Sequence, residues 1–244
     1  MSAYRESPAP VALITGATSG IGRAVARKLA ADGFAVIVHG RDAARGAAVV
    51  DEITASGGQA RFIAAELTEL SGIERLADAA SEVDVLVNNA GFSWFGSTAD
   101  LAPATFDQLF AANVRSAYYL VAAIAPRMAK RGTGSIINLG SMAGQIGLAG
   151  GAAYSATKAA LASLTRSWAA EFSPQGVRVN TIASGPAYTE GALQDRTTAL
   201  GGTTLLARAA QPEEIADVVA FLASPKAGYI TGAVIAADGG RTAI

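Results

Sequence analysis

Short apolar segments alternate with helical patterns along this 244-residue chain, and the alternation limits what the chain can fold into. Continuously apolar strands separated by helices are typical of a parallel sheet whose two faces are covered by crossover helices. No shift in composition marks a second domain, so we predict a single α/β domain over residues 11–244. The expected strands, about seven in all, are residues 11–15, 34–38, 60–64, 83–87, 135–139, 177–180 and 233–236.

A glycine-rich turn follows the first expected strand and leads directly into a helical pattern at residues 23–30. Gly16 permits a tight turn, Gly20 lets backbone N–H groups approach a ligand, and Gly22 allows the helix to pack closely on the strand. The helix N-terminus then favours a pyrophosphate. The spacing G-x-x-x-G-x-G differs from the general G-x-G-x-x-G fingerprint, and a plain strand–helix turn is the alternative. The pattern predicts a Rossmann-type, doubly wound parallel sheet that binds a dinucleotide.

The composition excludes several classes of protein. Hydrophobic residues make up 51% of the chain, which suffices for a sizeable core and excludes a disordered protein. A formal net charge of -1, with no basic block, provides no field for nucleic acid or an anionic membrane. The chain has no cysteine, and its single histidine, His39, cannot form a metal cluster. We therefore predict no disulfide and no metal site.

Residues 1–10 are polar and lack the apolar core of a signal peptide, which predicts a flexible tail. The apolar runs of the chain are much shorter than the roughly 20 residues that cross a bilayer. We therefore expect a cytoplasmic protein.

Tyr154 and Lys158 give the clearest indication of chemistry. Their spacing places a phenol and an ammonium on one face of a helix, where the Lys158 charge would favour the ionised form of Tyr154. An unperturbed tyrosine, with a pKa of about 10, is a poor acid–base catalyst at neutral pH, so a neighbouring cation would make it useful. Two unrelated surface residues are the alternative for this pair taken alone.

Polar, glycine-containing segments follow three further expected strands. They are residues 88–91 after the fourth strand, Gly140-Ser141 after the fifth and residues 183–186 after the sixth. Ligands of open α/β sheets bind outside the carboxyl ends of the strands. We therefore expect these segments to converge on one site.

The combined motifs resemble the short-chain dehydrogenase/reductase family over about residues 10–240. The chain looks like the one-domain branch that includes 3-oxoacyl-[acyl-carrier-protein] reductases and carbonyl reductases. The residues that carry the resemblance are Thr15-Gly16-x-x-x-Gly20-x-Gly22, Asn88-Asn89-Ala90-Gly91, Ser141 and Tyr154-x-x-x-Lys158.

The resemblance implies a role for each of four catalytic residues. Tyr154 would be the general acid–base, and Lys158 would lower its pKa and hold the nicotinamide ribose. Ser141 would donate a hydrogen bond to the substrate oxygen. Asn113 would hold a water molecule in a proton relay to Lys158, and a locally bonded or exposed Asn113 is the alternative.

The resemblance also implies a nicotinamide dinucleotide cofactor. Thr189 corresponds to the residue that bonds the nicotinamide carboxamide, whereas residues 89–91 would line the adenosine side and brace the central strands. Two positions depart from the family pattern: Ser184-Gly185-Pro186 replaces a usual Pro-Gly, and Glu66 replaces a usual aspartate. The expected cofactor-binding residues are Gly16, Thr18, Ser19, Gly20, Ile21, Gly22, Arg41, Glu66, Leu67, Asn89, Ala90, Gly91, Tyr154, Lys158, Gly185, Pro186, Ala187 and Thr189.

Arg41 decides which nicotinamide cofactor we expect. NAD specificity normally needs a carboxylate near the end of the second strand, and positions 39 and 40 carry none. The planar cation of Arg41 suits a 2′-phosphate, and Ser19 could add a hydrogen bond. Asp42 is expected to cap the next helix, although an inward orientation would favour NAD. We favour NADP(H), with NAD(H) as the runner-up, and expect His39 merely to be packed.

These features predict an NADP(H)-dependent oxidoreductase that interconverts a ketone and a secondary alcohol. The alternatives are an NAD-dependent alcohol dehydrogenase of the same family, a non-catalytic dinucleotide-binding relative, and another family reaction such as epimerisation or dehydration. Residues 188–210, the least regular stretch, are interpreted as a mobile flap over the site, with a surface loop as the alternative. An apolar substrate pocket is expected around Phe92, Trp94, Phe95, Ile146 and Leu148.

The expected partners are a small carbonyl or alcohol, or an acyl thioester. Arg127, Lys130 and Arg131 form a basic group that complements a helix dipole, with contact to an acyl-carrier protein as the alternative. The helical regions 101–128 and 152–172 carry apolar residues on more than one face, which favours packing between subunits. The resemblance implies a homotetramer, with a homodimer as the runner-up.

Overall fold

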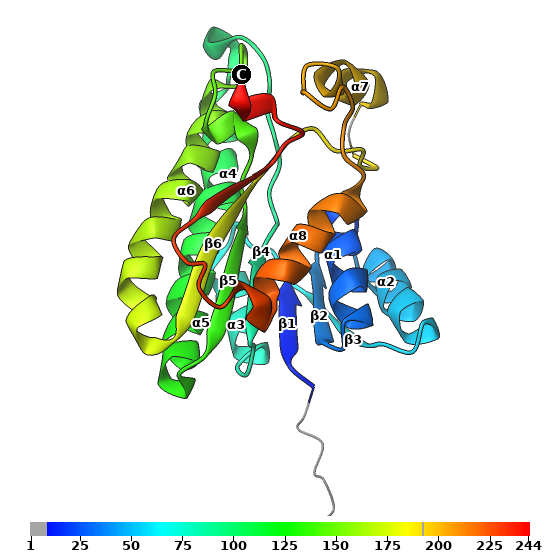
Figure 1. Cartoon of the computed structure of the whole chain (residues 1–244), viewed down its shortest axis with the longest axis vertical. Helices are drawn as coiled ribbons and strands as arrows, with labels where there is room; N and C mark the ends of the chain where they lie inside the picture. Colours follow the sequence, from blue (N-terminus) through cyan, green and yellow to red (C-terminus); the bar gives the residue numbers. More distant parts are fainter. Residues whose placement is uncertain (1–8, 192) are drawn as a thin grey trace, which may run out of the picture.

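A seven-stranded parallel sheet forms the centre of the computed structural model, which describes residues 9–191 and 193–244 (Figure 1). The strand order β3-β2-β1-β4-β5-β6-β7 is that of a doubly wound Rossmann-type sheet and confirms the predicted fold class. Residues 1–8 of the expected tail lie outside the described residues. The strands are β1 (Val11–Ile14), β2 (Ala35–Gly40), β3 (Gln59–Ala64), β4 (Val85–Asn88), β5 (Gly134–Leu139), β6 (Val177–Ser184) and β7 (Val234–Ala237).

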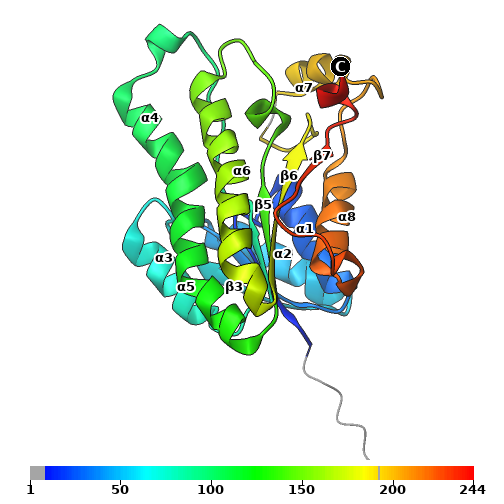
Figure 2. The same cartoon turned by 60° about the vertical axis from the view of Figure 1, so that its left-hand side comes forward.

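Helices cover both faces of the sheet. They are α1 (Gly20–Ala31), α2 (Ala43–Ala55), α3 (Leu70–Ala79), α4 (Pro103–Phe110), α5 (Ser116–Arg131), α6 (Ala152–Phe172), α7 (Gln194–Gly201) and α8 (Pro212–Ala223). One hydrophobic core joins α1, α2 and α8 to the sheet, and a second joins α3, α5 and α6 to its other face (Figures 1 and 2). Within the described part of the chain, no helix combines the length and apolarity needed to cross a membrane.

Successive residues of the inner strands point into different cores. In β1, Leu13 packs into the core of α3, α5 and α6, whereas Ala12 and Ile14 pack into the core of α1, α2 and α8. Full burial of a leucine or isoleucine side chain contributes about 1.5–3 kcal/mol. Because both faces of the sheet are covered, the strands read as continuously apolar segments, which is why the sequence revealed them.

Two strands run at least two residues further toward their carboxyl ends than the sequence predicts. β2 continues through His39 and Gly40, which pair with Ile63 and Ala64 of β3. β6 continues to Ser184, which pairs with Ala237 of β7. Polar residues end the apolar pattern at both places, but backbone pairing does not depend on side-chain polarity, so the ladders continue.

The segment predicted as a flap contains α7, which lies above the carboxyl ends of the central strands (Figures 1 and 2). Its two ends are joined by an isolated parallel bridge between Ala187 and Ala210. The Tyr188 N–H donates to the Ala210 carbonyl, and the Ala210 N–H donates to the Pro186 carbonyl, both at 2.9 Å. The segment therefore leaves the body of the fold and returns to it at one place.

Candidate active site

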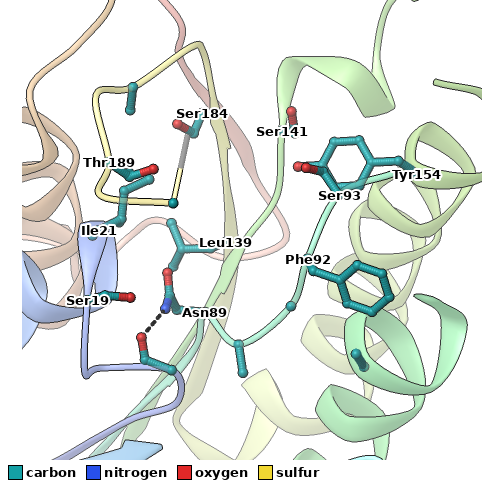
Figure 3. Close-up of a pocket in the computed structure, with 18 of the residues that line it drawn as sticks. Ser19, Ile21, Asn89, Phe92, Ser93, Leu139, Ser141, Tyr154, Ser184 and Thr189 are labelled. Atoms are coloured by element: carbon teal, nitrogen blue, oxygen red, sulfur yellow. Dashed lines mark hydrogen bonds between the residues drawn. The ribbon is translucent and has the colours of Figure 1, made fainter. Parts of the chain in front are cut away.

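A cleft of about 950 Å³ runs along the carboxyl ends of the strands (Figure 3). Arg41 and Glu66 line it beyond β2 and β3, and Tyr154 and Leu193 line it on the side of β5 and β6. Every residue predicted to bind the cofactor lines this cleft, as do the predicted catalytic residues except Asn113, which is buried behind it. The motifs that follow separate strands are thus brought together, while their roles stay predictions.

The glycine turn adopts backbone conformations that favour glycine. Gly16 and Gly20 have φ angles of +63° and +52°, in the left-handed region. A Cβ at Gly22 would lie 2.2 Å from the Gly16 carbonyl oxygen, and one at Gly20 would lie 3.1 Å from the Thr189 Cγ2. The turn is therefore too tight for a side chain at Gly22, and the N-terminus of α1 stays open to the cleft. This cradle fits a pyrophosphate group.

Thr15 and Asn89 tie the glycine turn to the end of β4. The Thr15 hydroxyl donates to the Val87 carbonyl at 3.2 Å and accepts from the N–H groups of Asn89 and Ala90, both at 2.9 Å. The Asn89 amide donates to the carbonyls of Thr15 and Gly16 at 2.9 and 3.1 Å, and Figure 3 draws one of these bonds. Asn89 thus braces the loops at the centre of the sheet.

His39 has a larger structural part than the packing predicted for it. The side chain is buried, its Nδ1 lies 3.2 Å from the Gly16 backbone nitrogen, and its Nε2 lies 3.1 Å from the Ala65 carbonyl oxygen. Since the Gly16 N–H must donate to Nδ1, the proton of the neutral ring sits on Nε2. Burial lowers the pKa of His39 and favours this neutral form. The imidazole therefore connects the glycine turn to the end of β3.

Arg41 and Glu66 face each other at the edge of the cleft. Arg41 is 78% exposed at its side chain, and its Nη1 lies 3.5 Å from the Glu66 Oε2. The other Glu66 oxygen accepts from the Thr68 N–H at 3.0 Å and the Thr68 hydroxyl at 2.9 Å. Burial raises the pKa of Glu66, but these hydrogen bonds and Arg41 together hold it below its ordinary value. Glu66 is therefore an anion in contact with the arginine expected to bind phosphate.

Asp42 caps α2, as predicted. Its carboxylate accepts a hydrogen bond from the Arg45 backbone N–H at 3.1 Å. This contact directs the carboxylate to the start of the helix, where it stabilises unpaired N–H groups. The alternative orientation, toward a cofactor ribose, is not adopted.

Tyr154 lies across the cleft from the glycine turn, on the same side as Ser93 and Ser141 (Figure 3). Burial raises the pKa of Tyr154, and the Ser141 hydroxyl offsets only part of this effect. The pKa of Tyr154 is therefore raised, not lowered as predicted, because burial dominates and Lys158 is not among the causes of the shift. The Ser141 Oγ accepts from the Ala143 N–H at 3.1 Å and keeps its own proton to donate.

Lys158 lies one turn further along α6. Its Nζ donates to the Leu139 carbonyl at 2.7 Å and lies 5.7 Å from the centre of the Tyr154 ring, as their spacing predicts. Burial lowers the pKa of Lys158 to about 8. The ammonium form still predominates at neutral pH, so the wall of the cleft carries a positive charge beside Tyr154.

Asn113 lies in a π-helical segment, Ala111–Arg115, between α4 and α5. Its Oδ1 accepts from the Phe92 N–H at 3.0 Å, and its Nδ2 donates to the Phe92 carbonyl at 2.9 Å and the Thr157 hydroxyl at 3.1 Å. The side chain is thus neither exposed nor bonded within its own helix, and it fixes the loop after β4 to α6, beside Lys158. Single π-turns are frequent at functional sites. The water-holding role stays a prediction.

The Ser184-Gly185-Pro186 segment departs from the family pattern, but the loop after β6 still lies along the cleft. The Gly185 N–H donates to the Ala237 carbonyl at 3.0 Å, and a Cβ at Gly185 would lie 2.6 Å from the Asp238 Cα. The chain then reaches Thr189, which lies against Gly20. Glu190 next forms an ion pair with Arg23 of α1 at 2.9 Å. Close packing on β7 therefore sets the path of this loop.

The far end of the cleft is partly the predicted apolar pocket. Phe92, Phe95 and Leu148 line the cleft, whereas Trp94 and Ile146 do not. The Phe95 ring lies 5.6 Å from the Tyr154 ring, measured between centres. Sequence reasoning named no individual residue of α7, although it placed a flap there. The lining residues that sequence reasoning missed include Ser93, Leu193, Arg196, Thr197 and Leu200.

The basic group near the end of α5 is occupied within the chain. Arg127 contacts Asp78 of α3 at 3.0 Å, and Arg131 contacts Asp84 at 3.7 Å. Lys130 and Arg131 also lie in the last turn of α5, where cations complement the helix dipole. These contacts favour the structural interpretation of the group.

The chain is similar to known proteins over most of its length. The family model described as enoyl-(acyl carrier protein) reductase matches residues 16–242. The 3-oxoacyl-[acyl-carrier-protein] reductase of Synechocystis sp. is 38% identical, over 95% of this chain and 96% of that protein.

Solved structures give the same result. A short chain dehydrogenase/reductase family protein is 48% identical with a TM-score of 0.92, covering 96% of this chain and 98% of the other. A blue fluorescent protein from a metagenomic library, in complex with NADPH, is 34% identical with a TM-score of 0.90, covering 95% and 97%. Together with the cleft and its motifs, these matches show that the chain belongs to the short-chain dehydrogenase/reductase family of oxidoreductases.

Proposed function

We propose that this protein is an NADP(H)-dependent oxidoreductase that interconverts a ketone and a secondary alcohol, with Tyr154 as general acid–base. The observation that carries the proposal is the presence of Ser141, Tyr154 and Lys158 in one cleft with the glycine turn. A hydroxyl that donates, a phenol that transfers a proton and a buried cation are the groups that carbonyl reduction needs.

In the reducing direction, a bound nicotinamide would supply the hydride to the carbonyl carbon. The Ser141 hydroxyl donates a hydrogen bond to the carbonyl oxygen, where negative charge develops. Tyr154 transfers its proton to that oxygen and becomes a phenolate. The Lys158 ammonium stabilises the phenolate, and solvent returns the proton. In the oxidising direction, the Tyr154 phenolate removes the alcohol proton.

The tyrosine keeps its proton well above neutral pH because burial raises its pKa. This state suits a general acid that waits for a carbonyl substrate. Oxidation requires the ionised form, so it is expected to need a higher pH than reduction does. The charge of Lys158 favours that ionised form in both directions.

NADP(H) is the proposed cofactor. Arg41 provides a cation for the 2′-phosphate, and the Asp42 carboxylate is held at the start of α2. The complex of a similar protein with NADPH supports this choice. An NAD-dependent alcohol dehydrogenase is the alternative, because the Arg41 contact with Glu66 weakens the argument from charge.

Titration of intrinsic or nucleotide fluorescence with NADPH and NADH tests the proposal, on the wild type and on Arg41→Ala. We expect the wild type to bind NADPH more tightly than NADH. Arg41→Ala should weaken NADPH binding by about 10- to 100-fold and so remove most of that preference. Equal affinities would favour the NAD-dependent alternative. Binding without NADPH oxidation by any ketone would favour a non-catalytic relative, and no binding at all would overturn both.

A further inference from the structure

α7 turns one face toward the cleft. Leu193, Arg196, Thr197 and Leu200 line the cleft, and their spacing of three to four residues places them on one side of the helix. The helix lies above the carboxyl ends of the strands, opposite the side where α4 and α6 begin (Figures 1 and 2). Residues on this face therefore meet whatever lies beside Tyr154.

Arg196 is one aromatic ring away from the proposed general acid. Its guanidinium carbon lies 3.9 Å from the centre of the Phe95 ring, and that ring packs against Tyr154. A cation over a ring is held electrostatically, but the contact uses no hydrogen-bond acceptor. The planar fork of Arg196 thus keeps donors for a ligand in the cleft.

The charges that line the cleft fall into separate groups. Arg41, Arg45 and Glu66 lie beyond β2 and β3, and Lys158 lies beside Tyr154. Among the lining residues contributed by α7 and the segment just before it, Arg196 carries the charge, and Leu193, Thr197 and Leu200 are uncharged.

Some arginines at the surface bind carboxylates of the protein itself, whereas Arg196 binds none among the described residues. Arg23 contacts Glu190, and Arg208 contacts Glu214 at 2.7 Å. Across residues 9–191 and 193–244, no carboxylate oxygen lies within 4.0 Å of the Arg196 side chain. A cation that points into a substrate cleft without an internal anion is suited to an anion on the substrate.

We propose that Arg196 binds a carboxylate on the substrate, so that the enzyme acts on oxo acids and the corresponding hydroxy acids. This inference rests on the proposed ketone–alcohol activity. The carboxylate pairs with the guanidinium, and the ketone lies on the other side of Phe95, between Ser141 and Tyr154. The planar fork of arginine matches the two oxygens of a carboxylate.

Paired substrates test the inference. Acetoacetate and levulinate are compared with their methyl esters, using NADPH and the wild type, Arg196→Gln and, as a matched control, Arg75→Gln on the exposed side of α3. We expect the wild type and Arg75→Gln to prefer the acids. Arg196→Gln should raise KM for the acids about 10- to 100-fold and leave kcat/KM for the esters nearly unchanged.

The esters also separate substrate recognition from a purely structural role. If Arg196 only holds α7 against Phe95, Arg196→Gln will impair acids and esters equally, and this result would overturn the inference. A wild type that prefers the esters would also overturn it. In both cases the proposed function stands, because a ketone is still reduced. The wild type could instead prefer acetoacetyl-coenzyme A over both acids and esters, and Arg196→Gln could abolish that preference. This result would identify a phosphate as the anion that Arg196 binds and would overturn the proposal of a carboxylate.

A binding measurement distinguishes failure of the inference from failure of the proposed function. Calorimetry of the NADP⁺-loaded protein compares cyclohexanecarboxylate with cyclohexanecarboxamide, which have similar shape but different charge. We expect the carboxylate to bind more tightly, and only while Arg196 is present. Equal binding of the two compounds contradicts the inference whatever the turnover. Selective carboxylate binding that needs Arg196, without reduction of any ketone, supports the contact between Arg196 and a carboxylate and contradicts the proposed reaction.

Discussion

The His39 imidazole accepts a hydrogen bond from the Gly16 backbone N–H at 3.2 Å, so a side chain of β2 holds the first residue of the glycine turn. The other ring nitrogen contacts the Ala65 carbonyl. Protonation would replace the acceptor at Nδ1 with a donor that faces another donor. The neutral ring is therefore part of the architecture of the proposed nucleotide site.

This contact predicts a loss of stability at mildly acidic pH. The pKa of His39 is lowered in the folded protein, so below about pH 6.5 the unfolded chain takes up a proton that the native state does not. The free energy of unfolding should fall as the pH drops from about 6.5 toward the folded pKa. Urea denaturation across this range measures it. His39 is the single histidine, so a slope that persists in His39→Gln would contradict the assignment.

Tyr154→Phe should remove turnover without preventing nucleotide binding. The variant keeps the ring that packs against Phe95 but loses the proton donor, so kcat should fall by at least about 100-fold. Assays of NADPH oxidation measure turnover, and fluorescence titration measures nucleotide binding separately. Unchanged kcat would show that another group transfers the proton.

Reduction should become slower in alkaline solution because of Lys158. Its pKa of about 8 means that the ammonium is lost above that pH, and the Tyr154 phenolate formed in the reaction then lacks its counter-charge. We expect kcat/KM for a ketone to fall as the pH rises above about 8. Circular dichroism over the same range controls for unfolding. A flat profile to about pH 10 would contradict a catalytic role for the Lys158 charge.

Gly22→Ala should disrupt the glycine turn. The added Cβ would lie 2.2 Å from the Gly16 carbonyl oxygen and 2.5 Å from the Asn89 amide, so the turn must shift. We expect a loss of about 1–3 kcal/mol in the free energy of unfolding and much weaker NADPH binding. Gly147→Ala is the matched control, because a Cβ there would meet no atom within 4 Å. Equal behaviour of the two variants would contradict the tight turn.

Glu66→Gln should improve NADPH binding. The change removes the anion next to Arg41, while the amide oxygen can still accept from Thr68. Because the Arg41 side chain is 78% exposed and the Glu66 side chain 41%, solvent screens the pair and the expected gain is small, up to about fivefold. Titration with NADPH and NADH in parallel measures it, and NADH affinity should not change. Weaker NADPH binding would show that Glu66 itself contacts the nucleotide.

The sequence was sufficient to predict the fold and to predict that its motifs meet at one site. Strands such as β1 are apolar throughout because both faces of the sheet are covered, and this property is visible in a single chain. The Asp42 cap was also predictable, because a cap depends on residues close in the sequence. Features that depend only on residues close in the sequence can therefore be predicted without the tertiary structure.

Features that depend on contacts between distant segments were not predictable in the same way. The i, i+4 spacing reveals the Lys158 charge near Tyr154, but it does not reveal the burial that raises the pKa of that tyrosine. The π-turn at Asn113 continues a helical pattern without a visible break. Arg196 reads as an ordinary polar residue of a short helix until α7 is placed above Phe95.

The bridge between Ala187 and Ala210 allows the segment between these residues to change while β6 and the reacting groups stay in place. Chain length and side chains between these two points can vary without moving β6 or the reacting groups, since both ends of the segment stay fixed. On the proposed function, part of the substrate preference then resides in an exchangeable segment, while Ser141, Tyr154 and Lys158 keep their places after β5 and on α6. A chimera that exchanges only residues 193–209 with a relative, and so keeps Thr189, should shift toward that relative's substrate preference and keep its own cofactor.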